Sequence, residues 1–483
     1  MRRYQIVLLI LGSLCLGLAG LAGLMGMISH TWAGDGAAGG FAECAVIAGF
    51  AGGLMTLVGI GAREELEFRS AVSLTVGAWI GLPLLASLPF TAGPDALSFT
   101  DAVFESISGF TTTGSTVMTG LDATAPTLLL WRAILQWIGG IGIIGLSIAI
   151  LPFLRIGGMQ LFQLESSDRS SDRIIARPGN LAVGIVSLYV ALTLLCTFGY
   201  AFTGMTAFEA ICHAMTTVST GGYSTSDASM GHFSAGAQWV SIVFMLGGAI
   251  PFLAYVRILT RNARNRPGAF EEVRGLFVLV ALFTAFLLTA QVMAGIYSGD
   301  SVRLALFNTV AIITTTGYAA GDYQLWGPLA MAAVFTLTFL GGCAGSTAGG
   351  FKVFRIQIIL RSIWRALQQA PLPHSVVTAH HAGQKLSNSD IASVALFGGL
   401  YVTTFAAASI ALAALGLDFE TAITGAATAI ANVGPGLGSV IGPAGNFATL
   451  PDAAKWLLGV VMILGRLEII VILLLFTPRF WGR

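Results

Sequence analysis

Ten long apolar stretches constrain the fold of this chain more than any other feature. They span residues 4–29, 44–62, 70–90, 133–154, 180–202, 238–256, 275–296, 327–351, 391–415 and 456–476. A helix needs about 20 apolar residues to cross the hydrocarbon core of a bilayer. Charged residues make up only 10% of the 483, whereas soluble chains carry about 25%. We therefore predict an all-α polytopic membrane protein with about ten transmembrane helices.

The basic residues predict how the chain is oriented. If the amino terminus is cytoplasmic, 20 of the 24 Lys and Arg residues fall on the cytoplasmic side, and the others are Arg132, Arg303, Lys455 and Arg466. Cytoplasmic loops of membrane proteins carry an excess of Lys and Arg. We therefore expect both termini to be cytoplasmic.

Acidic residues gather on the opposite side of the predicted membrane. Those expected to face outward or to line an outer mouth are Asp35, Glu43, Asp95, Asp101, Glu105, Asp122, Glu209, Asp227, Asp300, Asp322, Asp418, Glu420 and Asp452. An acidic vestibule would concentrate cations and repel anions. The alternative is that these acids are ordinary solvated loop residues.

A Thr- and Gly-rich motif recurs four times, each time between two apolar stretches. The copies read Ser-Gly-Phe-Thr-Thr-Thr-Gly ending at Gly114, Met-Thr-Thr-Val-Ser-Thr-Gly ending at Gly221, Ala-Ile-Ile-Thr-Thr-Thr-Gly ending at Gly317, and Thr-Ala-Ile-Ala-Asn-Val-Gly ending at Gly434. Such regular spacing, at roughly one hundred residues, indicates an internal repeat. We expect two extra helices in residues 1–66 and four repeats in residues 67–176, 177–268, 269–386 and 387–483.

Each copy follows a segment of helical length that is too short to cross the bilayer, such as residues 100–110 and 421–430. We interpret these segments as re-entrant half-helices, so that each repeat is a helix, a pore loop and a helix around one shared pore. Irregular backbone is tolerated at membrane depth only where protein or a water-filled path covers it. Four such loops are therefore expected to surround a single axis.

The loops carry the groups that a dehydrated cation requires. Backbone carbonyl oxygens replace the hydration shell in known filters, and glycine allows several carbonyls to face one axis. The carboxyl ends of the half-helices add negative potential. The predicted ion-binding residues are Thr112, Thr113, Gly114, Ser219, Thr220, Gly221, Thr315, Thr316, Gly317, Asn432, Val433 and Gly434. Since the fourth copy has Asn432 and Val433 in place of threonines, we expect only approximate fourfold equivalence.

Two further features suggest a gate. Residues 341–350 interrupt the eighth stretch with five glycines, which predicts a broken helix. The break is either a flexible gate beneath the filter or a kink packed on a neighbouring helix. Arg466 lies within the tenth stretch, where a charge costs about 3 kcal/mol and usually faces a cavity or a partner. The predicted gate residues are Gly345, Ser346, Thr347, Ala348, Gly349, Gly350 and Arg466.

Arg466 has two interpretations, which are compatible with each other. It either acts as an electrostatic barrier in the conduction path, or it pairs with loop carbonyls or with an acid on another helix. Glu468 is two residues away and thus on a different face of a helix, which makes it a poor direct partner.

These motifs resemble those of the Trk/Ktr/HKT superfamily of potassium transporters, over essentially the whole chain. Within it, the two extra spans favour the membrane subunits of bacterial Trk potassium-uptake systems (TrkH/TrkG type). The resemblance rests on residues 109–114, 219–223, 314–318, 341–352, 432–436 and 465–466. Gly114 occupies the position at which sodium-conducting plant members of the superfamily have serine, so its presence favours potassium.

The resemblance implies potassium uptake across the bacterial inner (cytoplasmic) membrane. It also implies a homodimer of chains that each imitate a tetrameric channel, and a cytoplasmic nucleotide-binding regulatory subunit of the TrkA kind. Potassium would be the ion held at the filter, and we expect no organic cofactor in this chain.

Three functions remain open at this point: a gated channel-like potassium uptake protein, a potassium symporter coupled to sodium or protons, and a membrane enzyme. Parallel repeats with filters favour the first, because many secondary transporters use inverted repeats. No regularly spaced set of catalytic or metal-ligating side chains occurs within the apolar stretches, so we do not expect an enzyme. The sequence carries no signal for ion coupling.

Overall fold

The computed structural model describes residues 2–62, 67–149, 178–259, 270–371, 375 and 377–482. Several sequence predictions lie outside these residues. They include the end of the fourth apolar stretch and nine of the arginines predicted to be cytoplasmic, namely Arg63, Arg155, Arg169, Arg173, Arg177, Arg261, Arg264, Arg266 and Arg483.

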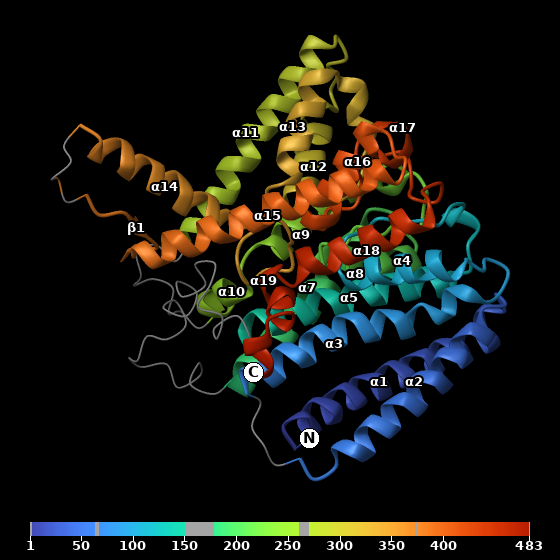
Figure 1. Cartoon of the computed structure of the whole chain (residues 1–483). Helices are drawn as coiled ribbons and strands as arrows, with labels where there is room; N and C mark the ends of the chain where they lie inside the picture. The colour runs from blue at the N-terminus through green and yellow to red at the C-terminus, as the bar shows by residue number, and fades with distance from the viewer. Residues whose placement is uncertain are drawn as a thin grey trace.

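Seven helices of the described residues are long and apolar enough to cross a membrane. They are α1 (Arg2–Ile28), α2 (Ala38–Gly59), α3 (Phe68–Ala86), α5 (Pro126–Ala149), α7 (Pro178–Phe202), α11 (Glu271–Met293) and α15 (Asn388–Ala414). All seven coincide with predicted stretches, which confirms the all-α membrane fold. α1 and α2 form a hairpin along one edge of the molecule (Figure 1).

The three remaining stretches are each interrupted. Two of them are divided into two helices, α9 (Ala235–Ala249) with α10 (Phe252–Leu259) and α18 (Asp452–Arg466) with α19 (Ile470–Leu475). The stretch 327–351, which comes between them in the sequence, contains α13 (Pro328–Thr338) and the loop after it, and the next helix, α14 (Val353–Gln369), begins beyond the stretch. The sequence predicted only the second of these breaks. Pro251 explains the first, because the residue before a proline is pushed out of the helical region, and Ile250 is extended with a ψ of 145°. The third break places Arg466 at the end of α18 rather than in the middle of a helix.

Four short helices dip into the molecule between the long ones. They are α4 (Phe99–Phe110), α8 (Ala207–Val218), α12 (Ser301–Ile313) and α16 (Phe419–Ala431). With 12 or 13 residues each, they extend about 20 Å at 1.5 Å per residue, too short for a hydrocarbon core of about 30 Å. The predicted half-helices are therefore present, and we call them the pore helices.

Polar side chains fix where three of these pore helices begin. Ser98, Thr206 and Asp418 each accept a hydrogen bond from the backbone N–H three residues further on. Such caps satisfy donors that the first helical turn leaves unpaired.

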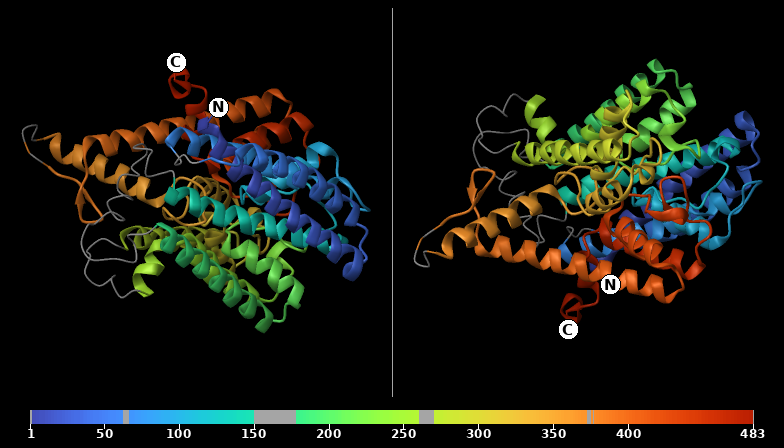
Figure 2. Two further views of the ribbon diagram at one scale, coloured as in Figure 1. Left: turned by 90° about the horizontal axis from the view of Figure 1, so that it is seen from below. Right: turned by 90° about the horizontal axis from the view of Figure 1, so that it is seen from above.

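Short helices and two strands complete the described chain. They are η1 (Ser29–Ala33), η2 (Leu88–Thr91), η3 (Leu121–Ala123), η4 (Ser229–Gly231), η6 (Tyr323–Trp326), α17 (Gly438–Ile441), η7 (Pro478–Trp481) and the antiparallel strands β1 (His380–His381) and β2 (Gln384–Lys385). Both termini lie at the same end as α10, α14 and β1, and α17 lies at the other (Figure 1). The gold coil between α13 and α14 lies at the centre of the molecule, among the helices (Figure 2).

Candidate ion pathway

The four loops that follow the pore helices share one backbone conformation. Each loop contains three consecutive residues of the same kind: a non-glycine residue in the left-handed conformation, a middle residue, and a glycine. The backbone N–H of the middle residue donates to the carbonyl oxygen five residues earlier in the chain. These hydrogen bonds run from Thr113 to Ser108 (2.9 Å), Gly221 to Thr216 (2.8 Å), Thr316 to Ala311 (2.8 Å) and Val433 to Thr428 (3.1 Å). The four motifs found in the sequence are therefore equivalent turns at pore-helix ends.

The left-handed residues are Thr112, Thr220, Thr315 and Asn432, with φ between 52° and 57°. A left-handed β-branched residue is a genuine outlier, at a cost of about 1–3 kcal/mol, and such outliers cluster at functional sites. The glycines two residues later are Gly114, Gly222, Gly317 and Gly434, also with positive φ.

This backbone pattern corrects the alignment of the second loop by one residue. Gly222, and not Gly221, is equivalent to Gly114, so that Thr220, Gly221 and Gly222 correspond to Thr112, Thr113 and Gly114. The sequence contains two consecutive glycines here, and either one fits a Thr-Gly motif. Ser219 is thus equivalent to Thr111, the residue that precedes the first filter triplet.

The four loops close into a ring. A side chain at Gly114 would collide with the carbonyl oxygen of Gly221, one at Gly222 with that of Thr316, and one at Gly317 with that of Val433. The fourth loop contacts the first and so completes the ring: a Cβ added to Gly434 would lie 2.8 Å from the carbonyl oxygen of Thr113. Each loop therefore packs its glycine against a carbonyl of the next loop.

A cavity of about 280 Å³ lies on one side of this ring, the side predicted to face outward, and the four glycines Gly114, Gly222, Gly317 and Gly434 line it. Of the predicted outward acids, only Asp227 is among its lining residues, and Arg132 lines it too. Glu105 is buried and paired with Arg132 at 2.8 Å, and Lys455 pairs with Asp101 at 2.5 Å. Others of these acids accept hydrogen bonds at helix starts or from loops, as Glu209, Asp227 and Asp418 do. The acidic vestibule stays a prediction.

The glycine-rich stretch 341–350 is a loop that packs against the pore-helix ends. The N–H of Gly349 donates to Thr315 Oγ1 at 2.6 Å, and Thr347 Oγ1 donates to the carbonyl of Val218 at 3.1 Å. A side chain at Gly349 would also meet the Ala431 carbonyl at 2.6 Å. The loop thus contacts the ends of three of the four pore helices, those of the second, third and fourth repeats.

The same loop is hydrogen-bonded to the break between α9 and α10. Cys343 N–H donates to the Ala249 carbonyl at 3.0 Å, Thr347 N–H to the Gly248 carbonyl at 3.1 Å, and Phe252 N–H to the Gly345 carbonyl at 3.0 Å. Backbone groups that two broken helices leave unpaired therefore satisfy each other at membrane depth.

Arg466 is buried, with 3% of its surface exposed, and its three guanidinium nitrogens have no hydrogen-bond partner among the described residues. Its neighbour Gly465 packs directly on the Ile430 carbonyl at the end of α16. Glu468 instead pairs with Arg355 at 2.7 Å. Arg466 is thus a buried cation beside the ring of loops, and the described residues supply none of the hydrogen-bond partners expected from the sequence.

A family model described as TrkH, a cation transport protein, matches residues 53–483. The chain belongs to the TrkH family. The potassium uptake protein TrkI of Halomonas elongata is 47% identical over 410 residues, covering 84% of this chain and 83% of that protein. TrkH of Escherichia coli is 33% identical over 486 residues, or 99% of both chains. The crystal structure of the potassium transporter TrkH from Vibrio parahaemolyticus superimposes with a TM-score of 0.89 at 32% identity, with 99% of each chain covered.

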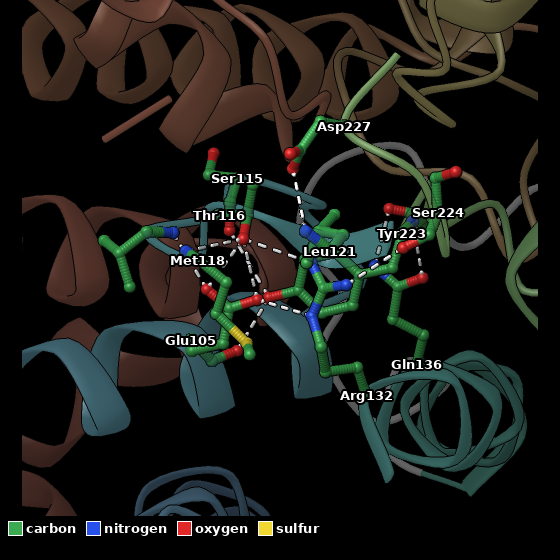
Figure 3. Close-up of polar contacts among 12 residues, drawn as sticks. Glu105, Ser115, Thr116, Met118, Leu121, Arg132, Gln136, Tyr223, Ser224 and Asp227 are labelled. Atoms are coloured by element: carbon green, nitrogen blue, oxygen red, sulfur yellow. Dashed lines mark hydrogen bonds and ion pairs between the residues drawn. The ribbon is translucent and has the colours of Figure 1, made fainter. Parts of the chain in front are cut away.

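In this TrkH-family chain, a buried polar network lies beside the first two filter loops (Figure 3). Glu105 accepts hydrogen bonds from Thr116 Oγ1 and Val117 N–H, both at 2.9 Å, in addition to its ion pair with Arg132. Arg132 also donates to the Ser224 carbonyl at 3.0 Å and stacks over Tyr223 at 4.0 Å. The network joins α4 and α5 to the chain that follows the second loop.

The sequence motifs did not predict every residue of this TrkH-family site. Gln136 on α5 donates from Nε2 to the Gly221 carbonyl at 2.6 Å and accepts at Oε1 from Tyr223 N–H at 3.1 Å. The sequence did contain a signal for this role, because Gln136 is a lone glutamine in an apolar stretch and a buried amide needs hydrogen-bond partners. Pro251 was likewise a signal for the break between α9 and α10, to which the loop at 341–350 is hydrogen-bonded.

Proposed function

We propose that this chain carries potassium into the cell through a gated, channel-like filter made by its four pore loops. The observation that carries the proposal is the closed ring of equivalent turns, with one glycine from each loop facing the outer cavity. The relatives named as potassium uptake proteins support potassium as the transported ion.

The chemistry of selection would reside in the backbone. Carbonyls at Thr113, Gly221, Thr316 and Val433 take part in the ring, and carbonyl oxygens are the groups that replace water around a dehydrated cation. With the corrected second loop, the proposed ion-binding residues are Thr112, Thr113, Gly114, Thr220, Gly221, Gly222, Thr315, Thr316, Gly317, Asn432, Val433 and Gly434. The pore helices would direct their negative carboxyl ends toward the ion.

We propose residues 345–350 and Arg466 as the gate. The loop packs beneath three pore-helix ends and has several backbone bonds that can break together. Arg466 adds a buried positive charge that would repel a cation in the closed state.

For the whole protein, we propose two extra helices within residues 1–66 and four repeats in residues 67–176, 177–268, 269–386 and 387–483. Each repeat would contain one long helix, one pore helix and a second helix, which agrees with the order of elements. We also propose the bacterial inner membrane as its location, with both termini cytoplasmic, and a homodimer that binds a cytoplasmic nucleotide-binding subunit. Both termini lie at the end of the molecule that carries α14 and its arginines, which supports this orientation.

The test is a set of reversal potentials for the purified chain in planar bilayers under opposed potassium, sodium and proton gradients. We expect the reversal potential to follow the potassium gradient. A current that ignores potassium would contradict the proposal. A reversal potential that shifts with the sodium or proton gradient by a fixed stoichiometric ratio would instead indicate a symporter.

A further inference from the structure

The second filter loop lacks a side chain that the other three possess. At the middle position of the filter triplet, the other loops have Thr113, Thr316 and Val433, whereas the second has Gly221. The φ of Gly221 is not positive, so this position does not require glycine for its backbone conformation. Another group must therefore account for the absence of a side chain there.

Gln136 fills the space where that side chain would lie. A Cβ on Gly221 would overlap Cδ and Oε1 of Gln136 and would lie 2.8 Å from its Nε2. The glutamine is fully buried, and its amide binds the loop on both sides of Gly222, at the Gly221 carbonyl and at the Tyr223 N–H (Figure 3).

The equivalent side chains in two other loops brace their own loop in a similar way. Thr113 Oγ1 lies 2.7 Å from Thr111 Oγ1, and Thr316 Oγ1 lies 2.8 Å from Thr314 Oγ1. Ser219, the counterpart of Thr111, has no such partner in its own loop and donates to the Thr216 carbonyl at 3.2 Å. The second loop is therefore braced from α5 instead of from within.

The helix that carries Gln136 is itself fixed against both neighbouring loops. One turn earlier, Arg132 is held by Glu105 and by the Ser224 carbonyl. One turn later, Gly139 packs directly on the Phe110 carbonyl at the end of α4. Residues spaced three or four apart share a helix face, so one face of α5 positions Gln136 against the filter.

We propose that Gln136 is a positioning residue of the ion filter: its amide replaces the missing side chain of the second loop and sets the direction of the Gly221 carbonyl. The inference rests on the proposed function, because it assigns Gln136 a part in potassium selection. The carboxamide of Gln136 donates to a carbonyl and accepts from an N–H at one site, whereas an ionised carboxylate offers acceptors alone.

Three variants test this inference by measuring the potassium-over-sodium permeability ratio in planar bilayers. Gln136→Ala should lower the ratio about five- to tenfold, the scale set by losing one or two hydrogen bonds. Gly221→Thr alone should lower it as well, because the new Cβ overlaps the amide of Gln136. The double variant Gln136→Ala with Gly221→Thr should recover the wild-type ratio to within about twofold, since the threonine can bond to Ser219 as Thr113 bonds to Thr111.

Gln291→Ala is the matched control, because Gln291 is a buried glutamine on α11 whose Nε2 has no partner among the described residues. It should leave the ratio unchanged. If Gln136→Ala is not monodisperse after purification, Gln136→Met, which keeps the volume and removes both hydrogen bonds, replaces it. A wild-type ratio in either single variant, or a double variant that recovers nothing, would overturn the role of Gln136. A wild-type protein without potassium preference would instead overturn the proposed function.

Discussion

At the scale of single residues, the four loops of the proposed filter share one strained backbone conformation. Among the described residues only seven non-glycine positions have positive φ, and four of them are the equivalent turn residues Thr112, Thr220, Thr315 and Asn432. Three are threonines, for which this conformation is costly. Asn432, which adopts it more readily, occurs in the loop that departs from the Thr-Thr-Gly motif. The fourth loop therefore differs from the Thr-Thr-Gly motif in sequence but keeps the same left-handed turn.

The residues of the four proposed filter loops could be predicted from the sequence, but the alignment of the second loop with the others could not. The motif located all four turns, because each copy follows a segment of helical length and lies between two apolar stretches. The Gly221-Gly222 pair left two alignments, and only the positive φ of Gly222 distinguishes them. The fate of Glu105 was equally hidden, because its partner Arg132 is 27 residues away in the sequence.

Gly114→Ser should lower the potassium-over-sodium permeability ratio. Gly114 has a φ of 85°, and any Cβ there collides with the Gly221 carbonyl of the ring. A strain of one or two kcal/mol corresponds to a factor of about 5–30 in an equilibrium. The control is Gly120→Ser, since Gly120 has a φ of 70° but open space around it. Equal ratios for wild type and Gly114→Ser in bilayer recordings would remove Gly114 from the filter.

At the scale of elements, the molecule is organised by broken helices. The breaks at 250–251 and 339–352 bond to each other, and the break after Arg466 lets Glu468 reach Arg355. Proline marks the first of these breaks in the sequence and glycine marks the second, and only the second was predicted. The third has no such signal, because Leu467 and Ile469 are ordinary helix residues and the left-handed φ of 59° falls on Glu468. At the break, Glu468 forms the ion pair with Arg355.

Arg466→Ala should raise potassium flux by about thirtyfold. One unit charge at about 8 Å opposes a potassium ion by roughly 2 kcal/mol at an effective dielectric constant of 20. Arg466→Lys keeps the charge and should remain close to wild type. Potassium release from vesicles containing equal amounts of each folded variant measures the effect. If the alanine variant conducts no faster than the lysine variant, the charge of Arg466 is not part of the gate.

At the scale of the whole molecule, the ring is fourfold while its inner contacts are not. The glycine loop of the third repeat reaches the pore-helix ends of repeats two, three and four, and it has no corresponding hydrogen bond to the first loop among the described residues. Thr315 Oγ1 accepts from Gly349 N–H, whereas the equivalent Thr112 Oγ1 has no partner within the part of the chain that the structure describes. Opening should therefore depend on some filter loops more than on others.

A matched pair of isosteric changes tests this asymmetry. Thr315→Val removes the acceptor of Gly349 N–H, and a buried donor left unpaired costs about 1–3 kcal/mol, which should destabilise the closed loop and raise the open probability at least about fivefold. Thr112→Val removes a hydroxyl that bonds to none of the described residues and should leave the open probability unchanged. Single-channel recordings separate open probability from conductance. Equal open probabilities in the two variants would show that the loop does not gate through Thr315.

The covalent continuity of the ring has an evolutionary consequence. In a homotetrameric channel, one mutation changes all four loops at once, so an intermediate sequence must tolerate the change four times over. Here each quarter of the ring is encoded separately, and a substitution in one loop can be compensated by a helix that neighbours that loop alone. Gly221 with Gln136, and Asn432 with its hydrogen bonds to Thr113 Oγ1 and the Met462 carbonyl, are two such local solutions. A single-chain pore is thus free to diverge one quadrant at a time.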